Sequence, residues 1–346
     1  MINSLQSLRG IFAVFIFLHH VEVFAAGGDS GVSFFLVLSG FVMTHGYRHR
    51  ILSGEITWRS YMRKRLLRIY PLHLIGFLAA IMLTNCWLGR YTPAVWSANL
   101  LLLQSWVPQK TVYFSCNAPS WCLSDLMFCY ALFPLLIRLT RKLTASKLAA
   151  LSAAMLAAYF AIIHLLPAHL LTPIIYINPL MRSLDFMLGM ALYAAVSSIS
   201  LPEKRISRRL AALIEPAAVA LYALAIVGYS AVPERYGLAS YWWLPSSLLI
   251  LVFALGSRSG GPVTSILNSR PLLWFGNLSF VFYMMHQPVI KGTLRLLTLC
   301  GHEVNPAQSP LFICATFTLS LLLSVAVNSK IEPPLRRLLS QKINII

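Results

Sequence analysis

Charge is scarce in this sequence, and acidic residues are the scarcest charged type. Only 11% of the 346 residues are charged, ten are Asp or Glu, and 58% are hydrophobic, with a mean hydropathy of +0.72. A water-soluble core of this length could not hide so much apolar surface. The composition therefore excludes a soluble globular protein and predicts an integral membrane protein. Since no stretch has the composition of a soluble domain, we expect one transmembrane domain over residues 1–346.

Metal-ligand spacings and internal repeats are also lacking. Six cysteines occur, but none forms a CxxC pair or has a histidine at metal-ligand spacing, so we expect no metal site. Cys116 and Cys122 fall on the predicted outer side, where a disulfide and apolar packing are the alternatives. The absence of a repeat of fixed period disfavours transporters built from duplicated halves.

Apolar stretches recur along the whole chain, and each is close to the roughly 20 residues that a membrane-spanning helix needs. The predicted spans cover residues 5–25, 31–47, 69–88, 120–137, 148–166, 174–196, 212–230, 241–257, 272–292 and 310–329. The shorter apolar stretch 94–107, flanked by prolines, predicts an interfacial or re-entrant element. The expected fold class is an all-α polytopic membrane bundle of about ten transmembrane helices.

The first 26 residues resemble a secretory signal, with Arg9 followed by an apolar run and then small residues. A signal peptide that is cleaved off has no use for the adjacent pair His19 and His20, whereas a retained functional helix could use either histidine. We therefore expect this segment to be retained.

The net charge of +18 comes from short basic clusters between apolar segments, not from one continuous face, so we expect no nucleic-acid partner. With the N-terminus in the cytosol, most of these clusters fall on the cytosolic side, as the positive-inside rule requires. This predicts that both termini are cytosolic. The clusters also attract anionic membrane lipid.

Ionisable side chains within the predicted spans are costly in a bilayer and usually carry function. His20 lies about 16 Å above Arg9 along the first helix at 1.5 Å per residue, and Tyr283 and His286 share one helical face. Taken singly, each such group could instead link two helices by a hydrogen bond. Their similar predicted depth favours a reaction site. The candidates are His20, Asp125, Asp185, Tyr283 and His286.

On the cytosolic side of this level, the sequence places a cluster of basic residues at the predicted entrance to the site. Arg65 and Arg68 in RLLRIYP lie on one face of a helix start, and guanidinium groups suit bidentate phosphate binding. A phosphorylated donor such as coenzyme A would fit there. The alternative is a topology cluster attracted to lipid head groups, which is our interpretation of Arg48, Arg50 and Arg59.

Five segments, in order, resemble motifs of the acyltransferase 3 family of integral membrane proteins, and specifically its exopolysaccharide acetyltransferase branch. They cover nearly the whole chain and pair Arg9 with His20, not with His19. The segments are LRGIFAVFIFLHHV, GVSFFLVLSGFVMT, RLLRIYP, NPLMRSLDFMLGM and FGNLSFVFYMMHQPV. A sixth segment, SWCLSDLMFCYALFP, departs from the family, because Leu126 stands where a Glu is usual. Asp125 is adjacent, but one residue is about 100° around a helix.

The resemblance implies an O-acyltransferase that uses acyl-CoA, in the first place acetyl-CoA, as donor and a cell-envelope carbohydrate, often lipid-linked, as acceptor. It implies a multi-pass protein of the bacterial inner membrane. Arg9, Arg65 and Arg68 would hold the donor phosphates, with no cofactor bound permanently. A transporter or flippase of lipid-linked sugars and a membrane receptor or scaffold are the other two classes considered.

The expected chemistry centres on His20, as general base on the acceptor hydroxyl or as the first acceptor of the acetyl group. Asp185 or Asp125 could orient an imidazole, as the carboxylate of a catalytic triad does. Tyr283 or His286 could donate a hydrogen bond to the developing oxyanion.

Overall fold

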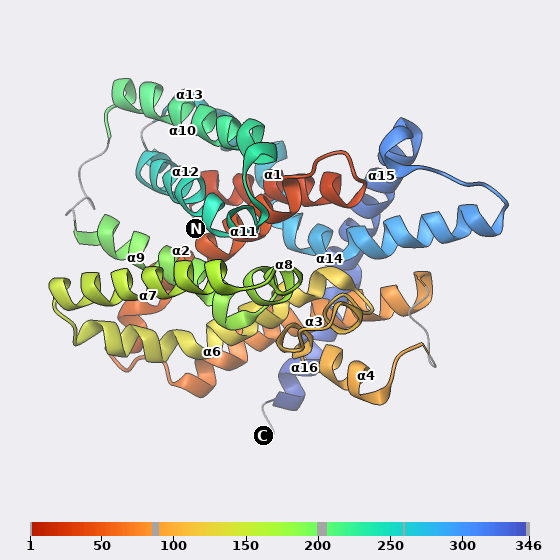
Figure 1. Cartoon of the computed structure of the whole chain (residues 1–346), viewed down its shortest axis with the longest axis horizontal. Helices are drawn as coiled ribbons and strands as arrows, with labels where there is room; N and C mark the ends of the chain where they lie inside the picture. The colour runs from red at the N-terminus through yellow and green to blue at the C-terminus, as the bar shows by residue number, and fades with distance from the viewer. Residues whose placement is uncertain (1, 85–89, 199–205, 259, 344–346) are drawn as a thin grey trace.

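The computed structural model describes residues 2–84, 90–198, 206–258 and 260–343. The chain is 85% helical, and no strand occurs in the described residues (Figure 1). The predicted all-α class is therefore confirmed.

A helix occurs at each of the predicted spans, although the boundaries differ by several residues. Seven helices in the described part of the chain are long and apolar enough to cross a membrane. The helices at the predicted spans are α1 (Asn3–His20), α2 (Gly27–Leu52), α3 (Trp58–Leu83), α6 (Trp121–Arg141), α7 (Ala145–Leu165), α9 (Pro179–Ser198), α10 (Arg208–Gly228), α12 (Trp243–Leu255), α14 (Arg270–Leu299) and α15 (Pro310–Ala326).

Short helices fill the connections. The predicted interfacial segment is divided between α4 and η1, neither of which is long enough to span. A π-helical turn, η8, joins α15 to a C-terminal helix, α16. The short elements are α4 (Pro93–Leu100), η1 (Gln104–Trp106), α5 (Lys110–Tyr113), η2 (Ala118–Ser120), α8 (Ala168–Leu171), η3 (Thr172–Tyr176), η4 (Tyr229–Ala231), α11 (Glu234–Gly237), η5 (Ser240–Trp242), η6 (Gly256–Arg258), α13 (Pro262–Leu267), η7 (Pro306–Gln308), η8 (Val327–Ile331) and α16 (Glu332–Ile343).

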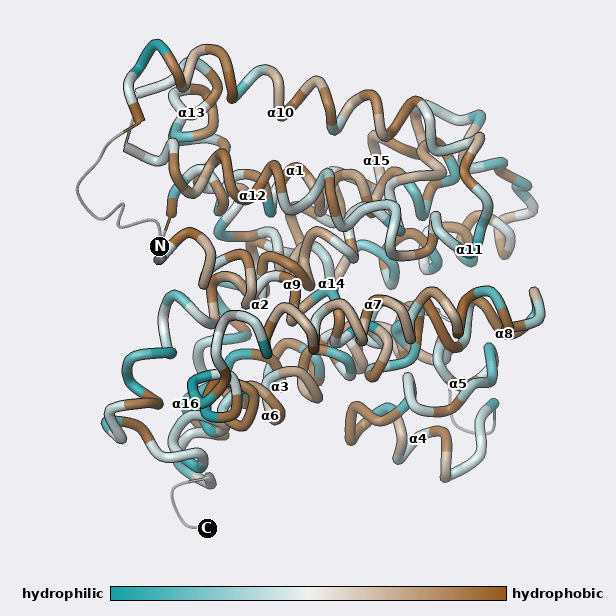
Figure 2. Tube along the Cα trace, turned by 60° about the vertical axis from the view of Figure 1, so that its left-hand side comes forward, coloured by the Kyte–Doolittle hydropathy of each residue, from teal (hydrophilic) through white to brown (hydrophobic). Residues whose placement is uncertain are grey.

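Helix α2 is central and the bundle is built around it. In its most apolar stretch 83% of the residues are buried, compared with 11% in α7 and 22% in α10. Both α7 and α10 carry long hydrophobic stretches, and α10 lies along the upper edge of the bundle in Figure 2. Their apolar outer faces suit contact with lipid, since a helix that is apolar on its outer surface is typical of a membrane protein.

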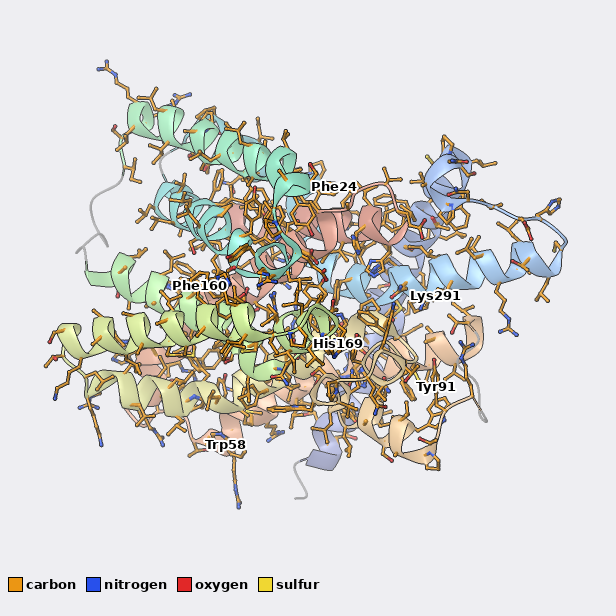
Figure 3. All side chains as sticks on the ribbon, in the orientation of Figure 1. Phe24, Trp58, Tyr91, Phe160, His169 and Lys291 are labelled. Atoms are coloured by element: carbon orange, nitrogen blue, oxygen red, sulfur yellow. The ribbon has the colours of Figure 1, made fainter. Side chains whose placement is uncertain are left out.

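Small residues allow the central helices to approach closely. A Cβ atom on Gly40 of α2 would collide with the carbonyl oxygen of Phe186 in α9, and one on Gly189 would collide with that of Val37. Such close backbone contacts are typical of membrane helix pairs. Side chains fill the spaces between the other helices (Figure 3). Glycines on facing helices therefore determine the distance between α2 and α9.

The disulfide considered for Cys116 and Cys122 does not form, because both are free. Cys116 packs beside Phe77 and Ala80, whereas Cys122 belongs to a different apolar cluster on α6. Both act as buried apolar side chains. Cys86 lies outside the described residues.

Candidate active site

Helices α1 and α14 run in parallel and in close contact, and this pairing positions the two predicted histidines. The Gln6 side-chain amide donates a hydrogen bond of 2.7 Å to the carbonyl oxygen of Gly276. A Cβ atom on Gly276 would collide with the Gln6 backbone, so the helices can approach only because glycine stands there. His286 follows Gly276 by ten residues, and His20 lies at the same level of α1.

The rings of His20 and His286 form a direct pair. Nε2 of His286 lies 3.3 Å from Nδ1 of His20, and the ring centroids are 4.9 Å apart. Nδ1 of His20 also lies 2.8 Å from the carbonyl oxygen of Ile16, and Nδ1 of His286 lies 3.3 Å from that of Phe282. His286 is fully buried, whereas His20 is half-buried.

The backbone carbonyls assign the tautomers of this pair. A carbonyl oxygen only accepts, so Nδ1 must carry the proton on both rings. Nδ1–H of His20 is then shared between the Ile16 carbonyl and Nε2 of His286, and within the described residues Nε2 of His20 has no hydrogen-bond partner. The lone pair on this Nε2 is what a general base needs.

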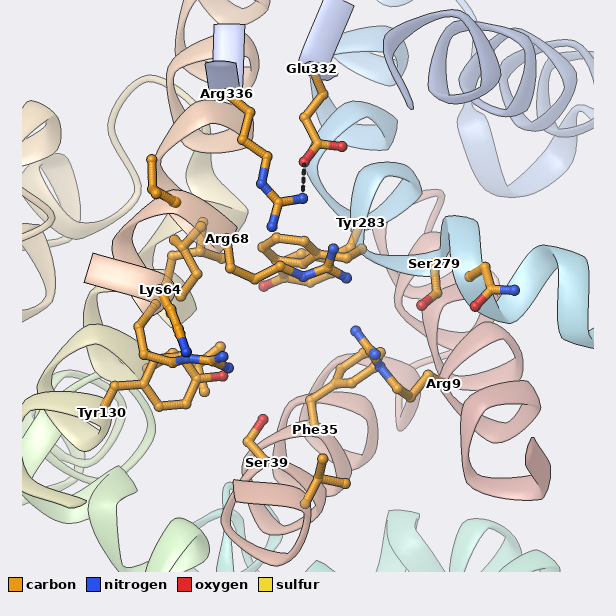
Figure 4. Close-up of a pocket in the computed structure, with 18 of the residues that line it drawn as sticks. Arg9, Phe35, Ser39, Lys64, Arg68, Tyr130, Ser279, Tyr283, Glu332 and Arg336 are labelled. Atoms are coloured by element: carbon orange, nitrogen blue, oxygen red, sulfur yellow. Dashed lines mark ion pairs between the residues drawn. The ribbon is translucent and has the colours of Figure 1, made fainter. Parts of the chain in front are cut away.

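The same two helices contribute to a cavity of about 1040 Å³. Residues from α1, α2, α3, α6, α14, η8 and α16 line it, and basic side chains point into it from several of these elements (Figure 4). The described residues that line it include one carboxylate, Glu332. The basic residues are Arg9, Lys64, Arg65, Arg68, Arg336 and Arg337.

The three arginines expected to bind phosphate all line this cavity. Arg9 donates a hydrogen bond of 3.4 Å to the Gln6 side chain. Arg65 donates one of 2.6 Å to the Tyr47 hydroxyl and lies over the Tyr47 ring. The guanidinium carbon of Arg68 lies 5.9 Å from the centre of the Phe280 ring. Aromatic faces thus hold the α3 guanidinium groups in place, a favourable arrangement for arginine.

Sequence reasoning missed Lys64, Arg336 and Arg337 as cavity residues. In the sequence they belong to basic clusters that also contain exposed residues, and the positive-inside pattern accounts for every member equally well. Only the packing of α16 against α3 shows which basic residues of these clusters line the cavity and which are exposed.

Tyr283 lies between the cavity and the histidines. It lines the cavity, and its ring centroid is 5.9 Å from that of His286 and 6.1 Å from that of Phe35. Its hydroxyl donates a hydrogen bond of 2.9 Å to the carbonyl oxygen of Pro119. Neither histidine is among the residues that line the cavity, so Tyr283 is the residue that connects the cavity lining with His286.

The two predicted carboxylates are not with the histidines. Asp185 forms a fully buried ion pair of 3.4 Å with Arg182, one turn earlier on α9. Asp125 is also fully buried, beside Ser105 and close to Arg182. In the part of the chain that the structure describes, neither His20 nor His286 forms a hydrogen bond or ion pair with a carboxylate. The groups that face Nδ1–H of His20 are the Ile16 carbonyl oxygen and Nε2 of His286.

Arg182 itself was missed in the sequence. Its guanidinium also donates hydrogen bonds to the Ser33 hydroxyl (3.1 Å) and the Leu238 carbonyl (3.4 Å). The available signal was the Arg-x-x-Asp spacing, which places both side chains on one helical face. Leu126, which stands at the family's Glu position, lines the cavity, whereas Asp125 does not.

Comparison with known proteins agrees with this architecture. Residues 2–328 match the acyltransferase 3 family, described as an acyltransferase domain. The chain is 29% identical over 341 residues to acyltransferase MdmB of Streptomyces mycarofaciens, covering 91% of this chain and 82% of that protein. It is 35% identical over 95 residues to protein 2 in the picA locus of Rhizobium radiobacter, covering 26% of this chain and 50% of that protein. No solved structure matches. The chain therefore belongs to the acyltransferase 3 family and is a multi-pass membrane acyltransferase.

Proposed function

We propose that this acyltransferase moves an acetyl group from cytosolic acetyl-CoA to a hydroxyl group of a cell-envelope or exported carbohydrate. The bacterial inner membrane is the expected location. One observation carries the proposal, namely that Tyr283 lines a basic cavity and also lies against His286, which is paired with His20.

The basic cavity supports a phosphorylated donor. Guanidinium groups bind phosphate through paired, charge-assisted hydrogen bonds, and three of those at the cavity belong to the segments predicted for this role. A donor whose phosphates are held there would direct its thioester arm toward Tyr283.

The histidine pair supports acyl transfer to a hydroxyl. Nε2 of His20 would take the proton of the acceptor hydroxyl as its oxygen attacks the thioester carbonyl carbon. The carbon–sulfur bond then breaks, and the thiolate of CoA receives the proton from the imidazolium. His286 would accept Nδ1–H of His20 throughout, which is the orienting role of the carboxylate in a catalytic triad.

Replacement of Arg68 by alanine should raise the KM for acetyl-CoA roughly ten- to hundredfold, because a charge-assisted phosphate contact is lost. The kcat should change little. Steady-state kinetics at varied acetyl-CoA measure both. Arg59→Ala is the matched control, since Arg59 is exposed near the start of the same helix and does not line the cavity. An unchanged KM in Arg68→Ala would argue against this donor site.

Replacement of His286 by alanine should lower kcat about tenfold or more while leaving the KM for acetyl-CoA unchanged, because His286 orients His20 and does not touch the donor phosphates. His286→Gln should recover part of the loss, since its amide oxygen can accept Nδ1–H of His20. Equal kcat values for the alanine and glutamine variants would show that accepting this hydrogen bond is not what His286 contributes.

Labelled acetyl-CoA incubated with purified protein and a glycan acceptor tests the whole proposal. Label that passes to the glycan supports acyl transfer. A transporter or flippase of lipid-linked sugars would leave the label on CoA. Mass spectrometry of envelope polysaccharide, with and without the protein, would then identify the sugar and its hydroxyl.

A further inference from the structure

The C-terminal helix α16 forms one wall of the basic cavity. The helical segment Pro310–Gln341, whose first part is apolar, has 32 residues, which at 1.5 Å per residue is about 48 Å and exceeds the roughly 30 Å hydrocarbon core. Its last part therefore extends beyond the core on the side of the cavity. The π-helical turn η8 lies where α15 becomes α16, and such turns often occur at functional sites.

Helix α16 packs against α3, the helix that carries three of the other basic residues of the cavity. Arg63 of α3 donates a hydrogen bond of 3.5 Å to the Ser340 hydroxyl. Arg336 and Arg337 line the cavity from α16, whereas Lys64, Arg65 and Arg68 line it from α3. Figure 4 shows Arg336 and Arg68 approaching the cavity from different helices.

Glu332 helps to position Arg336 through an ion pair. It lies one turn before Arg336 on α16, and the two side chains form an ion pair of 3.8 Å at the cavity. A single carboxylate cannot neutralise six basic side chains, so the cavity favours a ligand with several negative charges.

The positions of these charges on different helices indicate more about the ligand than their number does. One diphosphate carries two negative charges in one place, and Arg9 with the α3 residues is sufficient to bind it. A second pair of guanidinium groups on another helix suits a second, separate anionic group. Coenzyme A has that chemistry, with a pyrophosphate and a distinct 3′-phosphomonoester on its ribose.

We propose that Arg336 and Arg337 of α16 form a separate subsite for the 3′-phosphate of the acyl-CoA donor, so that the C-terminal helix selects CoA over donors that lack this group. The inference rests on the proposed function. It assigns the pyrophosphate to Arg9 and the α3 residues, and it gives α16 a direct role in donor specificity.

Competition binding with CoA and dephospho-CoA, which lacks only the 3′-phosphate, tests the subsite. The full chain is placed in nanodiscs of zwitterionic lipid. Wild type should bind CoA more tightly by roughly ten- to hundredfold. The double variant Arg336→Gln/Arg337→Gln should lose this preference and still bind dephospho-CoA as wild type does, which also shows that it is folded.

The matched control is Arg138→Gln/Arg141→Gln, which removes two exposed charges at the end of α6 that do not line the cavity. It should keep the full preference for CoA. Equal binding of the two ligands by wild type, or full preference in the α16 variant, would overturn the subsite alone. Failure of wild type to bind either ligand, with no acetyl transfer, would overturn the proposed function as well.

Anionic lipid is the other source of phosphate that could occupy these arginines. The same measurement in nanodiscs containing phosphatidylglycerol separates the two sources. If the α16 variant loses only its association with that lipid and keeps its preference for CoA, the arginines bind head groups and the subsite is refuted. The expected result is that the preference for CoA is lost with either lipid.

Discussion

Replacement of His20 by alanine should reduce acetyl transfer by a factor of about 10³, because a positioned general base contributes roughly 10²–10⁴-fold. In the wild-type geometry, His286 does not offer a free ring nitrogen to act as the base. Its Nε2 faces Nδ1 of His20, and its Nδ1 faces the Phe282 carbonyl.

Transfer of labelled acetyl groups to the acceptor measures this effect, and thermal unfolding in detergent shows whether the variant is folded. His19→Ala is the matched control, since His19 is the adjacent residue but its Nδ1 lies 2.9 Å from the Ala25 carbonyl oxygen and it is not hydrogen-bonded to His286 in the described structure. It should keep most of the activity. Wild-type turnover in His20→Ala would remove His20 from the reaction.

The helices could be predicted from the sequence because hydrophobic length is a local property. Each apolar stretch of about 20 residues must form a helix in lipid, whatever its neighbours are. The depth of His20 and His286 also follows from helical rise, but their direct contact does not. It depends on the close approach of α1 and α14 at Gly276, which involves residues far apart in the chain.

The charged residues were harder to assign because charge has several uses in a membrane protein. Arg336 lines the cavity and Arg138 does not, yet both follow an apolar stretch and both satisfy the positive-inside rule. Asp125 and Leu126 are neighbours, and only the packing of α6 shows that Leu126 faces the cavity. Tertiary contacts alone distinguish such residues.

Asp185 is the residue for which the sequence and the structure suggest different roles. Its position in a family motif predicts a carboxylate that orients a histidine. In the structure it pairs with Arg182 and lies beside the side chains of Ser33 and Trp243. Both members of the ion pair are fully buried, so each depends on the other to offset the loss of hydration.

Replacement of Asp185 by asparagine should therefore destabilise the protein by about 3–5 kcal/mol, since it leaves the Arg182 guanidinium buried without its counter-charge. Unfolding by heat or denaturant in detergent measures the loss. The double variant Asp185→Asn/Arg182→Gln should recover part of that stability, because no uncompensated cation remains at this position.

Turnover per folded molecule then distinguishes a structural role of Asp185, as the ion-pair partner of Arg182, from a catalytic role in orienting His20. If Asp185 acts through Arg182, the double variant should transfer acetyl groups at close to the wild-type rate once it is folded. A carboxylate that oriented His20 would behave differently, because restoring stability would not restore kcat. Inactivity of a stable double variant would place the Asp185–Arg182 pair in the reaction. Activity would leave His286 as the group that orients the base, and the chemistry of this acyltransferase would then rest on two imidazoles and the backbone carbonyls that hold them.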